Sequence, residues 1–180
     1  MKNRPRVFFR TLIPFLFYSI ISTSGTYAQN QAKIDSIWQL VNAAKEDTNQ
    51  VKLLIELAAF YENTNPDTAL YYYDQALDLS EKIGAKKYMA QSLILIGFNH
   101  QTRGSSEQTL EYFQQALKIC EEIEDTERIS RCYVNMGLVF HDQGSYNTAI
   151  DYYLKALAKG SEGGHRSVMT FTYNNLGRAY

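Results

Sequence analysis

The segments YVNMGLVF, at Tyr133–Phe140, and YNNLGRAY, at Tyr173–Tyr180, share tyrosine, asparagine, glycine and a closing aromatic residue at matching positions. The second segment follows the first by forty residues. The same step relates three further sets of residues: Gly97, Gly137 and Gly177; Ala76, Ala116 and Ala156; and Tyr72, Tyr112 and Tyr152. Such a fixed interval is the signature of an internally repeated architecture.

Each copy has the pattern of two helices. In the second copy, Leu93, Ile96 and Gly97 fall on one helical face, and the pattern breaks at Gly104. A second apolar stripe follows around Phe113. Three copies, at 50–89, 90–129 and 130–169, and the start of a fourth at 170–180 therefore predict an all-α fold, an α-solenoid of about three and a half helix pairs.

The recurring glycines predict a close approach between helices. Glycine inside a helix costs about 1 kcal/mol relative to alanine, so its return at Gly97, Gly137 and Gly177 indicates a neighbouring helix at that point. We expect the alanines at 76, 116 and 156 to face these glycines. We expect the aromatic residues at 73, 113 and 153 to fill the space between neighbouring pairs.

These features resemble the tetratricopeptide repeat, through the small residues Gly97 and Ala116, the aromatic residue Phe113 or Tyr153, and the stretch Gly144–Tyr146. The resemblance covers residues 50–180. The usual period of the family is 34 residues, so a period of forty implies longer helices. The proline that usually closes a repeat is missing.

The first 28 residues have the three-part form of a secretory signal peptide. Four basic residues precede the apolar run from Leu12 to Ile21, and Thr26-Tyr27-Ala28 offers a cleavage site after Ala28. The alternative is an uncleaved anchor, although the apolar run is short for a membrane-spanning helix. We expect a periplasmic or secreted protein whose mature chain does not enter the membrane.

Residues 29–49 precede the repeats and are predicted to include a capping helix. Ile34, Ile37, Trp38 and Val41 recur at helical spacing and can cover the open end of the first repeat. Asp47 to Gln50 has the form of a capping box at the start of the next helix. At the other end, we expect Phe171, Tyr173, Leu176 and Tyr180 to pack on the third repeat.

The sequence does not favour catalysis. It shows no phosphate-binding loop with its lysine and no histidine spacing typical of a metal site, so no metal or cofactor is predicted. Removing residues 1–28 leaves 14 basic and 19 acidic side chains, a formal charge of −5, which argues against a nucleic-acid partner.

A binding surface for a protein or peptide is the remaining candidate, which the resemblance places on the concave face formed by the first helix of each repeat. Asparagine can pair with a peptide backbone, and arginine can hold a carboxylate. The predicted peptide-binding residues are Asn135, Asn175, Asn174, Arg131, Arg178 and His141. The alternative is that these polar side chains are merely solvated.

Two cysteines leave a second question open. Cys120 and Cys132 both fall on apolar stripes on either side of one turn. Two buried free thiols are favoured over a disulfide, although an exported protein meets oxidising conditions.

Three function classes follow. The first is a non-catalytic, exported scaffold that binds a protein or peptide. The second rests on resemblance: long repeats containing Asn-Asn-Leu-Gly, as at Asn174–Gly177, behind a signal peptide are similar to the periplasmic sensor portion of bacterial histidine kinases. In that case the chain is a truncated sensory region, and a C-terminal signalling domain is missing. The third is a hydrolase with dispersed catalytic residues, which is the least favoured.

Overall fold

The computed structural model describes residues 31–180, within which every regular element is an α-helix, so the predicted all-α fold is confirmed. The predicted signal peptide, residues 1–28, lies outside the described residues. After a helical segment at residues 31–43 come α2 (Thr48–Tyr61), α3 (Pro66–Lys82), α4 (Lys86–Thr102), α5 (Ser106–Glu122), α6 (Thr126–Asp142), α7 (Tyr146–Glu162) and α8 (Arg166–Ala179).

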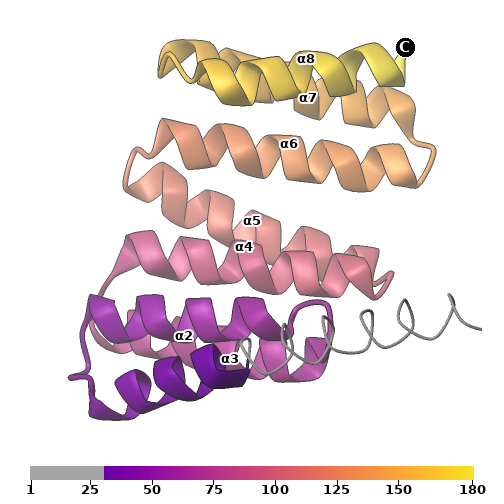
Figure 1. Cartoon of the computed structure of the whole chain (residues 1–180). Coiled ribbons are helices and arrows are strands. Elements are labelled where there is room, and N and C mark those ends of the chain that lie inside the picture. Colours follow the sequence, from indigo (N-terminus) through magenta and orange to yellow (C-terminus); the bar gives the residue numbers. More distant parts are fainter. Residues whose placement is uncertain (1–30) are drawn as a thin grey trace, which may run out of the picture.

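The helices stack as the antiparallel pairs α2–α3, α4–α5 and α6–α7, and α8 follows at the far end (Figure 1). The even-numbered helices form one layer and the odd-numbered helices the other. Because α4, α6 and α8 begin at Lys86, Thr126 and Arg166, the predicted repeat boundaries at 90, 130 and 170 lie four residues inside these helices.

Left-handed residues make the sharp turns between pairs. Gly84 and Gly164 both have φ of 68° in these turns. Glu124 occupies the corresponding place in the middle turn with φ of 55°, a conformation that costs a side-chain-bearing residue about 1–2 kcal/mol. The turn geometry therefore persists where the sequence offers no glycine.

Within two of the pairs, a glycine of the first helix lies against an aromatic ring of the second. A methyl group added at Gly97 would lie 2.7 Å from the ring of Phe113, and one added at Gly137 would lie 2.5 Å from the ring of Tyr153. The expected close approach is confirmed at both positions, but the aromatic ring, and not an alanine, fills the space opposite the glycine. Nothing lies within 4 Å of such a group at Gly177.

The helical segment at residues 31–43 covers the first repeat with Ile37 and Val41, which join the core around Val51 and Leu54 of α2. Trp38 was predicted on this apolar stripe but is 53% exposed, because it follows Ile37 directly and faces away.

The start of α2 is only half of a capping box. Asp47 accepts hydrogen bonds from the backbone N–H groups of Asn49 and Gln50, as the predicted cap requires. The Gln50 side chain instead donates to the carbonyl of Val41, 3.0 Å away. This bond ties α2 to the preceding helix.

The buried face of α8 differs from the predicted one. Val168, Thr172, Asn175 and Ala179 are buried, whereas Phe171, Tyr173 and Tyr180 are 52%, 57% and 86% exposed. The buried residues follow the helical period, and the three aromatic residues lie off it. Hydrophobicity alone therefore indicated the wrong face.

Candidate functional site

A groove with a volume of about 560 Å³ crosses the layer of even-numbered helices. We call it the central groove, and its lining residues come from α4, α6 and α8. They are Gln91, Ile94, Leu95, Phe98, Arg128, Arg131, Val134, Asn135, Ser167, Val168 and Phe171. The first helix of each pair supplies the surface, and the second helix supports it from behind.

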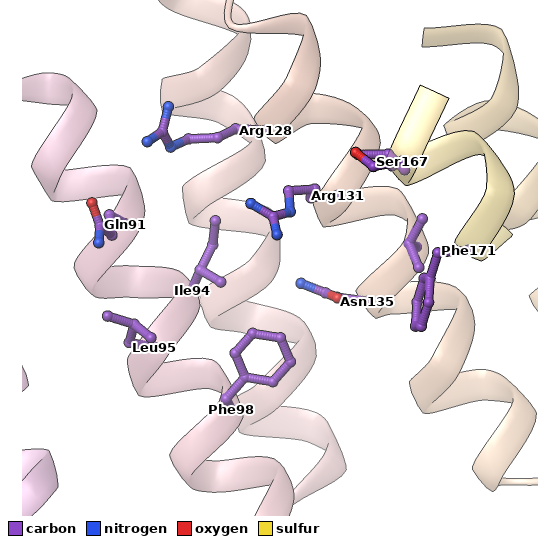
Figure 2. Close-up of a pocket in the computed structure, with 11 residues that line it drawn as sticks. Gln91, Ile94, Leu95, Phe98, Arg128, Arg131, Asn135, Ser167 and Phe171 are labelled. Carbon is purple, nitrogen blue, oxygen red and sulfur yellow. The ribbon is translucent and has the colours of Figure 1, made fainter. Parts of the chain in front are cut away.

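The central groove has a polar end and an apolar end (Figure 2). Arg128 and Arg131 lie at one end, Phe98 lies toward the other, and Asn135 projects between Arg131 and Phe98. Both arginines are near the start of α6, where the helix dipole also favours a negative group. This arrangement can accept a carboxylate at one end and apolar side chains at the other.

The two arginines differ in availability. Arg128 forms an ion pair with Asp125, the residue that caps α6, and its side chain is only 23% exposed. Arg131 is 63% exposed and its partner Glu127 is 3.7 Å away, a separation at which a surface pair contributes little. Arg131 is therefore the cation that a ligand can recruit.

The structure brings together two of the six predicted binding residues, because Asn135 and Arg131 both line the central groove. Asn175 is buried, and its side-chain amide donates to the Phe171 carbonyl at 3.0 Å, so its predicted place on the concave surface is wrong.

The other three predicted residues do not line the central groove. Asn174 and Arg178 are exposed on α8. His141 packs edge-on against the ring of Tyr146, with the Asp142 carboxylate 3.6 Å away. Its contacts are those of a packed side chain near the end of α6.

Sequence reasoning missed the aromatic walls of the central groove. Phe98 and Phe171 are 37% and 52% exposed and both line it. Phe171 was predicted to pack on the third repeat instead. Their helical positions could have indicated this exposure, because both phenylalanines lie one position away from the buried stripe of their helix.

Cys120 and Cys132 are both free and both buried. The neighbouring thiol lowers the pKa of Cys120, and the same interaction together with burial raises the pKa of Cys132. The two side chains thus contact each other within the core.

Within residues 31–180, no group of three or more His, Cys, Asp or Glu side chains is placed to hold a metal ion. None of the helices in that part of the chain combines the length and apolarity needed to cross a bilayer.

A family model for the tetratricopeptide repeat matches residues 49–122 and 88–162. The chain belongs to the tetratricopeptide repeat family. Proteins of this family are scaffolds for protein or peptide partners. No curated protein resembles the sequence closely enough to be called a relative.

Solved structures with a similar fold include the apo form of RapI, with a TM-score of 0.74, 16% identity, and coverage of 85% of this chain and 44% of RapI. A Rap protein complexed with competence and sporulation factor has a TM-score of 0.66 at 20% identity. The match covers 87% of this chain and 50% of that Rap protein. A signal transduction ATPase from Pyrococcus horikoshii with a tetratricopeptide repeat sensor has a TM-score of 0.73 at 19% identity. The match covers 90% of this chain and 25% of the ATPase.

These identities show a shared fold and no more. The chain spans less than half the length of RapI and a quarter of the signal transduction ATPase. The repeats of the present chain thus correspond to one part of each larger protein.

Proposed function

We propose that the chain is a non-catalytic scaffold that binds an extended peptide in the central groove. The observation that carries the proposal is Asn135, a half-buried amide between apolar walls and an available arginine. An asparagine side chain can donate to a peptide carbonyl and accept from a peptide N–H, and so fixes the backbone irrespective of sequence.

The ends of the central groove add selectivity to this backbone contact. Arg131 offers a bidentate donor to a carboxylate of the peptide. Phe98 and Phe171 offer exposed rings to an apolar side chain. The expected ligand therefore carries an acidic group and an apolar residue a few positions apart.

A soluble random peptide library tests this function. We expect selected peptides to bind the protein and to lose about tenfold in affinity with Asn135→Ala, which removes two hydrogen bonds of about 0.7 kcal/mol each. Asn174→Ala is the matched control, because Asn174 is exposed outside the central groove. Equal losses from both variants, or no selected peptide, would refute the proposal.

We also propose that residues 1–28 direct export and are removed after Ala28. The charged start, apolar run and small-residue junction support this proposal. Amino-terminal sequencing of the protein recovered from its native host tests it directly: a mature start at Gln29 is expected, and a retained Met1 contradicts cleavage.

A second candidate is the sensory region of a larger signalling protein, such as a histidine kinase. In its favour, the repeats share their fold with the sensor of a signal transduction ATPase and cover only a quarter of that protein. Coding DNA read past Tyr180 distinguishes the candidates, because an open frame into a signalling domain supports the sensor and a stop codon supports the separate scaffold.

A further inference from the structure

A second, smaller pocket shares Phe98 with the central groove. It has a volume of about 220 Å³ and is lined by Glu62, Asn63, Phe98, Asn99 and Thr102. Phe98 lines both cavities, so they are neighbours on α4. We call this pocket the terminal pocket, since it lies at the carboxyl ends of α2 and α4.

The terminal pocket contains a polar atom without a partner. Asn99 is only 6% exposed, and its Oδ1 forms no hydrogen bond. Its Nδ2 donates to the Pro66 carbonyl at 2.9 Å, which fixes the orientation of the amide, because an oxygen could not donate there. A buried acceptor left unpaired costs about 1–3 kcal/mol.

The fold itself does not require this asparagine. Forty residues later, the equivalent position of α6 is Val139, which is buried to 2% exposure in an apolar cluster. The polar side chain is thus particular to α4.

The other polar groups of the terminal pocket are mainly acceptors. The Glu62 carboxylate accepts from the Tyr73 hydroxyl and keeps further lone pairs. The Thr102 hydroxyl donates its hydrogen to the Asn99 carbonyl at 2.8 Å, which leaves only its lone pairs. The last carbonyls of α2 and α4 add partial negative charge.

The cation nearest in sequence is already paired. Arg103, which follows Thr102, bonds to Asp67 at 2.5 Å and does not compensate Glu62. Glu62 and Asn63 are both exposed, so their side chains can rearrange around an entering group and uncover Asn99 Oδ1. A pocket of open acceptors, one carboxylate and two helix carboxyl ends suits a cationic donor.

We propose that the terminal pocket binds a primary ammonium group of the peptide held in the central groove, from either a lysine side chain or the amino terminus. This assignment rests on the proposed peptide-binding function. Along α4, the lining of the two cavities begins at Gln91 and ends at Thr102. The distance between these two residues along the helix axis is about 16 Å, at 1.5 Å per residue. About five extended peptide residues cover that length.

The two cavities together fix the direction of the peptide. The arginines attract its acidic group, and the terminal pocket takes its ammonium group at the far end of α4. A peptide bound in reverse would place like charges at both ends, which is unfavourable.

Pentylamine, which is protonated at neutral pH, is the first probe, and pentanol is its uncharged counterpart. In ¹H–¹⁵N NMR titrations, we expect pentylammonium to shift the Asn99 side-chain amide signals and pentanol not to do so. Glu62→Gln keeps an acceptor for Tyr73 but removes the charge, and we expect it to weaken pentylammonium binding about fivefold. Glu107→Gln, on exposed α5 surface outside both cavities, is the control.

Equal shifts from the amine and the alcohol, or an unchanged response in Glu62→Gln, would overturn the proposal and leave an ordered water as the partner of Asn99. The second variant, Asn99→Val, copies the natural residue of the next repeat. It should weaken pentylammonium binding, followed through the backbone amide signals of Asn63 and Thr102, while retaining the helical circular dichroism of the protein.

Peptides from the library then identify the source of the ammonium. Acetylation of the amino terminus removes one source, and replacement of lysine by norleucine removes the other; the change that weakens binding identifies it. Peptide binding with no response to pentylammonium overturns the subsite but leaves the scaffold function. A response to pentylammonium with no peptide bound overturns the scaffold function but leaves the subsite.

Discussion

The hydroxyl group of Tyr153 is expected to destabilise the protein, so Tyr153→Phe should stabilise it. The ring is fully buried on Gly137, and the hydroxyl oxygen is buried without a hydrogen-bond partner. An unsatisfied buried hydroxyl costs about 1–3 kcal/mol. Removing it keeps the ring and should raise the free energy of unfolding by about 1 kcal/mol.

The equivalent tyrosine of the first repeat provides the contrast. Tyr73 donates to the Glu62 carboxylate, eleven residues earlier in the chain. Tyr73→Phe loses that bond and should lower the free energy of unfolding by about 1 kcal/mol, because Glu62 is exposed and regains water. The same chemical change is therefore expected to have opposite signs at two positions eighty residues apart.

The opposite signs arise because aspartate, which faces Tyr153, is one methylene group shorter than the glutamate that faces Tyr73. The residue eleven before Tyr153 is Asp142, which lies near enough to contribute, after burial, to a raised pKa of Tyr153, yet forms no bond with it. Asp142→Glu lengthens the side chain to match Glu62 and should supply the missing acceptor, with a gain of about 1 kcal/mol. In the second repeat the equivalent pair is Thr102 and Phe113, which has neither a carboxylate nor a phenolic hydroxyl.

Urea and thermal unfolding of the protein, followed by circular dichroism, test these signs. A change of 1 kcal/mol corresponds to about 2–4 °C in the unfolding midpoint for a chain of this size. Asp142→Glu and Tyr153→Phe should also be non-additive, because each removes the reason for the other's gain. A loss of stability in Tyr153→Phe equal to that in Tyr73→Phe would refute the reasoning and show that an ordered water satisfies the hydroxyl.

Three further outcomes are expected. Glu124→Gly should stabilise the protein by about 1 kcal/mol in urea unfolding, because it relieves a positive φ; a loss would mean that its side chain makes a needed contact. Gly137→Ala should cost about 2 kcal/mol or more against the Tyr153 ring, whereas Gly177→Ala, with open space around it, should be neutral or stabilising by up to about 1 kcal/mol; similar effects of the two would contradict the packing. Burial first, and then the bond to Glu62, raises the pKa of Tyr73 above its usual value near 10. The stability that the protonated Tyr73 contributes is therefore complete below pH 10 and is lost as the pH rises above 10. Tyr73→Phe should reduce that alkaline loss of stability, and an unchanged alkaline profile would exclude a contribution from Tyr73.

The fold could be predicted from sequence because the same packing contacts recur in each repeat and require the same residue types. Gly97 and Gly137 recur where an aromatic ring crosses the helix, and no other residue fits there without a shift. The helix starts were less predictable, since Lys86 and Arg166 follow turns that depend on backbone conformation more than on side-chain type.

The site was predictable only in part, because residue type does not give side-chain direction. Asn135 and Asn175 are chemically identical and forty residues apart, yet one lines the central groove and the other bonds to its own helix. Phe171 looked like a core residue because it is apolar, although its helical phase places it on the surface. A stricter reading of phase would have recovered Phe171 but not the difference between the two asparagines.

The repeats of one chain also act as controls for one another. At the packing positions, the copies keep similar residues, as Tyr73, Phe113 and Tyr153 do.

At one position that lines the central groove, the copies diverge: Gln91, Arg131 and Phe171 are equivalent residues. Packing requires only that such residues stay off the buried stripe, so it does not explain why they are an amide, a cation and an aromatic ring in turn. A recognition surface does explain it, because each helix then contacts a different part of the ligand. Asn99 and Val139 differ in the same way within the core, and the polar member of that pair is the one beside a pocket. The places where the repeats disagree are thus where binding should be sought, and both cavities lie at such places.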